Sequence, residues 1–130
     1  MILLDTQVLI WLAISPERIS PAAAAAIQQA GSMGESPQIS AVSLYEVANA
    51  IRRGRIQPAM PIRAFLDRLK SRFTVIPVSE KIAIRAGELS EPFHGDPMDR
   101  MIAATAIMEK CTLITSDSKI RAANVCKVLW

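Results

Sequence analysis

The sequence predicts an α/β protein, a three-layer α/β/α sandwich built around a central, mainly parallel sheet. Short, continuously apolar segments alternate with longer segments in which apolar residues have helical spacing. Continuous apolar runs of this kind are typical of parallel strands buried on both faces. The length of 130 residues, 51% of them apolar, suits a single core, so we expect one domain covering residues 1–130.

Strand and helix signals alternate through the first half of the chain. The apolar run at 2–4 lacks helical spacing and indicates a buried strand that ends at Asp5. Ser20 and Pro21 are an N-cap and a first helical residue. The elements expected are a strand at 2–4, a helix from Pro21 that stops before Gly31, a loop at 31–37, a strand at 38–41, and a helix from Ser43 through Arg53 that ends at Gly54.

The second half repeats this alternation. Phe65, Leu66 and Leu69 share one face of a helix that begins at Pro61. Asp96 and Pro97 form another helix start. The remaining elements expected are a strand at 74–78, a helix capped by Ser79, a helix from Pro97, a strand at 112–115, a short helix at 118–123 and a last strand at 125–129.

Composition excludes several classes of protein. No apolar segment is long enough to span a membrane, and the acid at position 5 argues against an export signal, so we expect a cytoplasmic protein. Cys111 and Cys126 lack the spacing of a zinc or redox motif and are interpreted as buried thiols. His94, the only histidine, is interpreted as an ordinary loop residue.

Basic residues are clustered although the net charge is only +3. A solvated helix face can explain any single cluster. Beside an acidic site, however, basic flanks are what a polyanionic substrate needs, because the site itself repels phosphate. The clusters are Arg52, Arg53 and Arg55; Arg63, Arg68, Lys70 and Arg72; and Lys119 and Arg121.

Four acids map to one edge of the predicted sheet. Asp5 and Asp117 follow strands, whereas Glu46 and Asp99 are expected in the first turns of helices. In a parallel sheet the carboxyl ends of the strands and the starts of the following helices lie along one edge, where ligands usually bind. The four carboxylates should therefore meet.

Helix capping is the alternative explanation for each acid taken singly. Ser43 and Glu46 fit a capping box, as do Asp96 and Asp99, and Asp117 and Asp5 can each cap a helix. Capping does not explain why so many charged caps were used along one edge. Carboxylates that lie close together repel one another unless a cation sits between them, and Mg²⁺ or Mn²⁺ prefers such oxygen ligands. The set therefore predicts a metal site for one or two ions.

Several neighbours are candidate supporting residues. Thr6, Thr115 and Ser116 are hydroxyls beside Asp5 and Asp117, placed either to orient the site or to form ordinary hydrogen bonds at strand ends. Asp96 is a further carboxylate near the site, although it is expected to act chiefly as an N-cap. Arg100 follows Asp99 and can either reach a phosphate or hold a neighbouring acid.

Four motifs together resemble the PIN-domain family and, within it, the VapC-type toxins of bacterial toxin–antitoxin pairs. The motifs are Leu3-Leu4-Asp5-Thr6, Ser43-Leu44-Tyr45-Glu46-Val47, Asp96-Pro97-Met98-Asp99-Arg100-Met101-Ile102-Ala103-Ala104 and Leu113-Ile114-Thr115-Ser116-Asp117. The resemblance covers nearly the whole chain. It implies a Mg²⁺- or Mn²⁺-dependent endoribonuclease, a homodimer, and a cognate antitoxin whose C-terminal segment wraps the nuclease.

The hypothesis that follows is hydrolysis of RNA phosphodiester bonds by water. Asp5 and Asp99 would bind the principal metal, Glu46 would complete the site or position the water, and Asp117 would support it or a second ion. Arg52, Arg53 and Arg55 become candidate RNA-binding residues. Two alternatives stay open: a receiver-like phosphoacceptor domain, and an RNA-binding module without catalysis. The receiver fits less well, because Asp5 is followed by Thr6 instead of a second acid, and Thr115-Ser116-Asp117 offers no lysine in the place that a receiver requires.

Overall fold

The sheet at the centre of the molecule has five strands, all paired in parallel, in the order β3-β2-β1-β4-β5. This architecture comes from a computed structural model, which describes residues 1–90, 93 and 95–130. The strands are β1 (Ile2–Leu4), β2 (Gln38–Ser40), β3 (Thr74–Ile76), β4 (Thr112–Ile114) and β5 (Val128–Leu129). The α/β class and the parallel sheet predicted from the sequence are confirmed.

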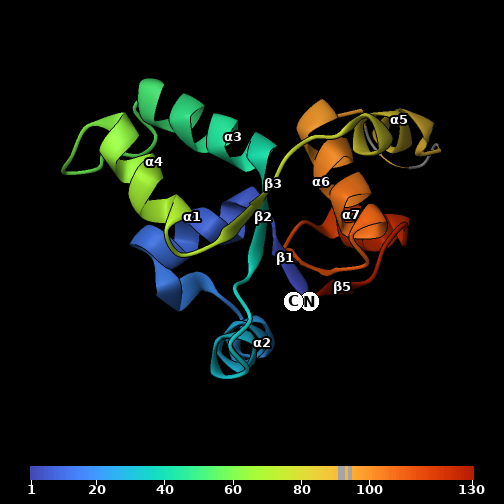
Figure 1. Cartoon of the computed structure of the whole chain (residues 1–130), viewed down its shortest axis with the longest axis horizontal. Helices are drawn as coiled ribbons and strands as arrows, with labels where there is room; N and C mark the ends of the chain where they lie inside the picture. The colour runs from blue at the N-terminus through green and yellow to red at the C-terminus, as the bar shows by residue number, and fades with distance from the viewer. Residues whose placement is uncertain (91–92, 94) are drawn as a thin grey trace.

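Helices cover both faces of this sheet. In Figure 1, α1, α3 and α4 lie on one side of the strands and α5, α6 and α7 on the other. The helices are α1 (Thr6–Ile14), α2 (Pro21–Ser32), α3 (Ala41–Arg52), α4 (Ile62–Lys70), α5 (Glu80–Glu88), α6 (Pro97–Met108) and α7 (Ser118–Ala123), with a 3₁₀ turn at Pro16–Arg18. None of the helices in the described part of the chain has the length and apolar character that crossing a bilayer requires.

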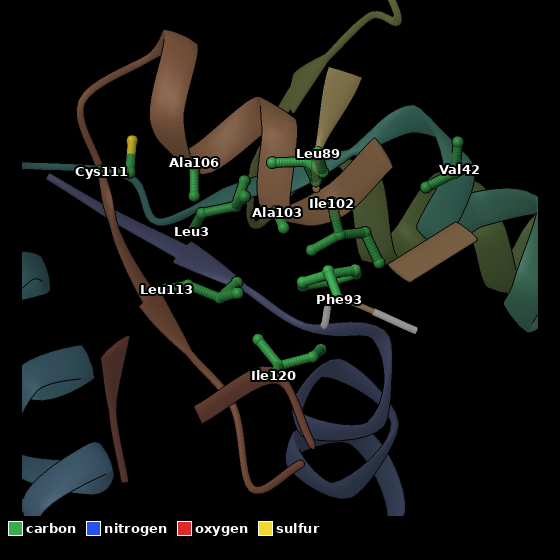
Figure 2. Close-up of a cluster of buried hydrophobic side chains, with 10 residues drawn as sticks. All are labelled: Leu3, Val42, Leu89, Phe93, Ile102, Ala103, Ala106, Cys111, Leu113 and Ile120. Carbon is green, nitrogen blue, oxygen red and sulfur yellow. The ribbon is translucent and has the colours of Figure 1, made fainter. Parts of the chain in front are cut away.

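Successive residues of the central strands face opposite layers. Leu3 and Leu113 pack with Ile102 of α6 and Ile120 of α7 in one cluster, which Figure 2 shows. The residues that follow them along the strands, Leu4 and Ile114, pack in the second cluster with α1 to α4. Because successive side chains of a strand point to opposite faces of the sheet, even three-residue strands contribute side chains to both hydrophobic clusters.

Some predicted boundaries are wrong for local reasons. Helix α2 continues through Gly31 to Ser32, because the left-handed residue that ends it is Gly34, with φ +76°. The loop predicted at 31–37 is correspondingly shorter. The strands predicted at 74–78 and 125–129 are reduced to β3 and β5. Pro77 has no N–H to continue the first, and Asn124, with φ 52°, turns the chain before the second.

The start of α3 is the boundary that bears on the site. Ser40 is the N-cap, and its hydroxyl accepts from Val42 N, so the helix begins at Ala41 and not at Ser43. The predicted capping box of Ser43 and Glu46 is therefore wrong. Ser43 is buried inside the helix, and Glu46 lies in the second turn instead of the first.

The two cysteines differ in burial. Cys111 is buried and Cys126 is half-buried, and both are free thiols whose pKa is raised by burial. The prediction of a buried thiol thus holds fully only for Cys111. His94, predicted to be a loop residue, lies outside the described residues.

Candidate active site

A pocket of about 510 Å³ opens at the carboxyl edge of the sheet. It lies where the strand order reverses, since the chain leaves β1 toward β2 and later crosses to β4 on the other side. The residues that line it are Asp5, Thr6, Gln7, Ile10, Glu46, Ala50, Arg55, Ile56, Asp96, Asp99, Ser116 and Asp117. The pocket thus brings together all four predicted acids, and Asp96 as a fifth.

Asp5 is held at the end of β1 by two hydrogen bonds to its carboxylate. Thr6 N donates to Oδ1 at 2.8 Å, and Thr115 Oγ1 donates to Oδ2 at 2.7 Å. The side chain is only 6% exposed. Burial raises the pKa of Asp5, and the charges of Asp117 and Asp96 add to this, whereas the two hydrogen bonds oppose it. Asp5 caps α1, as the capping alternative foresaw, but one helix cap does not require this degree of burial.

Glu46 reaches the pocket from the second turn of α3. Thr6 Oγ1 donates to its Oε1 at 2.5 Å and lies 2.8 Å from Ser43 Oγ in a hydroxyl–hydroxyl hydrogen bond. Burial raises the pKa of Glu46, and the nearby charges of Asp5 and Asp96 raise it further against the effect of Thr6. Because Glu46 is not in a capping position, the structural alternative proposed for it does not apply.

Asp96 and Asp99 enter from the first turn of α6. Asp96 is the N-cap, accepting from Met98 N at 2.9 Å and from Asp99 N at 3.5 Å. The pKa of Asp99 is raised to about 7, first by burial and then by Asp5, Asp96, Asp117 and Glu46 in that order. Asp99 is therefore the point where the repulsion among the acids is concentrated.

Asp117 begins α7 and closes the pocket on the β4 side. Its Oδ1 accepts from Lys119 N at 2.8 Å and from Ile120 N at 3.2 Å, so capping accounts for this oxygen. Its own N donates to Thr115 Oγ1 at 3.1 Å. Thr115 thus links the acid of β1 to the acid after β4, and Thr6 links Asp5 to Glu46.

Of the two remaining predicted supporting residues, one lies in the pocket and the other does not. Ser116 lines the pocket. Arg100 points elsewhere, because its guanidinium donates to the carbonyls of Ala86 at 3.0 Å and Phe93 at 3.3 Å, and also to that of Leu89. It therefore ties the end of α5 to α6 and is not among the lining residues.

Sequence reasoning missed a buried hydroxyl, Ser43, and an apolar wall of the pocket. The wall consists of Ile10, Ala50 and Ile56. Ile10 stands four residues after Thr6, and Ala50 four residues after Glu46, so both lie one helical turn beyond a predicted site residue. That spacing was the available signal.

The donors of the pocket suit a hard divalent cation. All of its ionisable acceptors are carboxylates, which Mg²⁺ and Mn²⁺ prefer over nitrogen or sulfur. Within residues 1–90, 93 and 95–130, no group of three acidic, histidine or cysteine side chains is arranged as a ready-made metal site. Burial and, after it, the charges of the neighbouring carboxylates raise the pKa of Asp99, and a bound cation would relieve this repulsion.

The chain is thus an all-parallel α/β sandwich with a pocket of carboxylates at the switch point of its sheet. The chain belongs to the PIN-domain family: the model of the PIN domain matches residues 2–125.

Comparison with individual proteins agrees with membership of the PIN-domain family. The chain is 35% identical to ribonuclease VapC22 of Mycobacterium tuberculosis over 121 residues, which is 93% of this chain and 90% of the relative. Its fold is similar to that of VapBC2 from Rickettsia felis, with a TM-score of 0.74, 22% identity, and coverage of 99% and 98% of the two chains. VapBC from Salmonella typhimurium gives a TM-score of 0.73 at 18% identity, with coverage of 98% and 96%.

Proposed function

We propose that the protein is an endoribonuclease and the toxin of a toxin–antitoxin pair, and that it hydrolyses RNA phosphodiester bonds with Mg²⁺ or Mn²⁺. The observation that carries the proposal is the convergence of five carboxylates in one pocket, with the pKa of Asp99 raised to about 7. The relative VapC22 is named a ribonuclease and matches this chain over nearly its whole length.

Asp5 and Asp99 would hold the principal cation, with Glu46 completing the site and Asp117 supporting it or a second ion. Bound there, the cation would supply positive charge that stabilises a phosphate and lowers the pKa of water. Thr6 and Thr115 keep three of these carboxylates or their backbone in place by hydrogen bonds. Glu46, held by the hydrogen bond from Thr6, would complete the site or position the attacking water.

The receiver-like alternative disagrees with the topology. Receiver and flavodoxin-like sheets have the order 2-1-3-4-5, whereas this sheet has the order β3-β2-β1-β4-β5. Position 115, directly after β4, is a threonine that donates to Asp5, and positions 116 and 117 are not lysine either. We set the receiver aside, and the remaining alternative is RNA binding without catalysis.

A toxin of this kind would have a cognate antitoxin and would form a homodimer. The similar structures from Rickettsia felis and Salmonella typhimurium are described as VapBC proteins bound to DNA, and another, from Klebsiella pneumoniae, as a toxin–antitoxin complex. They support the antitoxin as partner. Tyr45 on α3 is 60% exposed and would be accessible to a second copy.

Cleavage of a mixed RNA pool tests the proposal. We expect shortening of RNA in Mg²⁺ or Mn²⁺, none with EDTA, and a loss of at least about 100-fold in Asp99→Asn. Asp67→Asn is the matched control, because Asp67 is exposed and paired with Lys70 at 3.1 Å on α4. RNA that is bound but never shortened by the wild-type protein would establish the non-catalytic module instead.

A further inference from the structure

The three arginines that follow Glu46 on the chain have different surroundings. Arg52 donates to Asn49 Oδ1 at 2.5 Å, and Arg53 is exposed outside the pocket. Arg55 alone lines the pocket with the acids. It is also the only basic side chain among the described residues that does so.

The turn after α3 holds Arg55 in this place. Gly54 adopts φ +74°, a left-handed conformation that ends the helix. Arg55 N then donates to Ala50 O at 2.9 Å, and the following residue, Ile56, is buried with 6% exposure. The backbone of Arg55 is therefore anchored on both sides while its side chain stays exposed.

Among the residues that the structure describes, none holds the guanidinium of Arg55 in a salt bridge or hydrogen bond. Within the described part of the chain, no carboxylate lies within 4.0 Å of it. Ala50, to which its backbone bonds, is one helical turn beyond Glu46, a rise of about 6 Å. The backbone of Arg55 thus lies at least one helical turn beyond Glu46, next to Ala50 and Ile56 of the apolar wall formed by Ile10, Ala50 and Ile56.

We propose that Arg55 binds the phosphate next to the scissile one in a single RNA strand, with the sugar or base between them on the apolar wall. This inference rests on the proposed function. A guanidinium binds phosphate through two parallel hydrogen bonds, and it offsets the repulsion between the strand and the acids. A contact to phosphate carries no sequence information, and an apolar wall offers no hydrogen-bonding groups to a base, so Arg55 would position the strand without reading its sequence.

The test compares three variants that each remove one positive charge: Arg55→Gln, Arg53→Gln and, as the control on the opposite helical layer, Lys81→Gln. Binding of a fluorescent single-stranded oligoribonucleotide is measured against salt concentration in Ca²⁺. We expect Arg55→Gln to weaken binding on the order of tenfold and to lower the salt slope by about 1, and Lys81→Gln to change neither. An equal loss in Arg53→Gln would show a diffuse basic patch and overturn the assignment.

Cleavage kinetics in Mg²⁺ separate this inference from the proposed function. Arg55→Gln should raise KM on the order of tenfold and leave kcat within about twofold, because the contact is the same in the ground state and the transition state. Replacing the phosphate next to the scissile linkage by a neutral methylphosphonate should weaken binding of the RNA by the wild-type protein but not by Arg55→Gln. If the modification weakened RNA binding equally in both proteins, the inference about Arg55 would be wrong even though the wild-type protein cleaves RNA. Absence of cleavage by the wild-type protein would refute the proposed function, and the binding comparison would still decide on Arg55.

Discussion

Ionising Asp99 in the folded protein is unfavourable, because burial and four surrounding carboxylates raise its pKa to about 7. The unfolded chain has no such surroundings, so the carboxyl there titrates near its ordinary pKa of 3.8. Between these two values the folded state binds the proton more tightly than the unfolded state. The contribution of Asp99 to stability is therefore greatest at low pH and is lost as the pH rises through about 7.

Replacing Asp99 by asparagine should stabilise the metal-free protein at pH 8 while abolishing cleavage. The amide keeps the shape and removes the repelled charge, and each kcal/mol relieved should raise Tm by about 3–5 °C. Thermal melts in EDTA at pH 8 and pH 5.5 measure this, and the gain should be smaller at pH 5.5, where Asp99 is largely protonated. Asp67→Asn should show no such gain, and a Tm for Asp99→Asn below that of the wild type at pH 8 would contradict the argument.

Thr115→Val tests the hydrogen bond that opposes the rise in the pKa of Asp5. Without the donor at 2.7 Å the pKa of Asp5 should rise further, so the acid limb of the pH profile of kcat/KM should move to higher pH. Asp117 N also loses its acceptor, and we expect stability to fall by about 1–3 kcal/mol. Thr112→Val, at the opposite end of β4, is the control. An unchanged acid limb would mean that Asp5 does not limit activity.

At the scale of the elements, the positions where helices end determine which side chains line the pocket. Gly54, with φ +74°, turns the chain after the end of α3, and Arg55 follows it into the pocket lining, whereas Gly31 lies inside α2 and is followed by the left-handed Gly34. Two glycines that both looked like helix terminators in the sequence thus have opposite roles. Only a residue with positive φ requires glycine.

The pair Gly54→Ala and Gly31→Ala should change stability in opposite directions. At Gly54, with φ +74°, a Cβ costs about 1–2 kcal/mol in backbone strain and should also raise KM by loosening Arg55. At Gly31 nothing lies within 4 Å of an added Cβ, so alanine should add about 0.5–1 kcal/mol. Chemical denaturation of both variants decides, and a destabilised Gly31→Ala would refute the assignment of Gly31 as a helical position.

For the whole molecule, the acidic pocket links folding to cation binding. A cation that binds only the folded state at 100 times its Kd adds about 2.7 kcal/mol of stability. We expect Mn²⁺ or Mg²⁺ to raise Tm, more at pH 8 than at pH 5.5, because protons compete for Asp99, whose pKa is about 7. Thermal melts at increasing metal concentration measure this rise in Tm. EDTA should reverse the rise, and Asp5→Asn should abolish it. An equal shift in Asp5→Asn would place the cation outside the pocket.

Much of the arrangement could be read from local patterns. Continuous apolar runs before Asp5 and Asp117 indicate strands buried on both faces, and Asp96 with Pro97 marks the start of α6, as found. These signals are local because backbone propensity, capping and burial depend on residues only a few positions apart. Together with the parallel sheet they place the acids at one edge. Their roles as metal ligands stay a prediction.

By itself, then, the sequence determined the α/β class, most of the elements and the shared edge of the carboxylates. Only the tertiary structure decided the strand order, the burial of Ser43 beside Thr6, the direction of Arg100 toward the end of α5, and the presence of Arg55 alone among its neighbours in the pocket. The physical reason is range: Thr6 and Ser43 are 37 residues apart, and Thr115 and Asp5 are 110 apart. Such pairs meet only when strands from distant parts of the chain pack together, and no local pattern specifies which will do so.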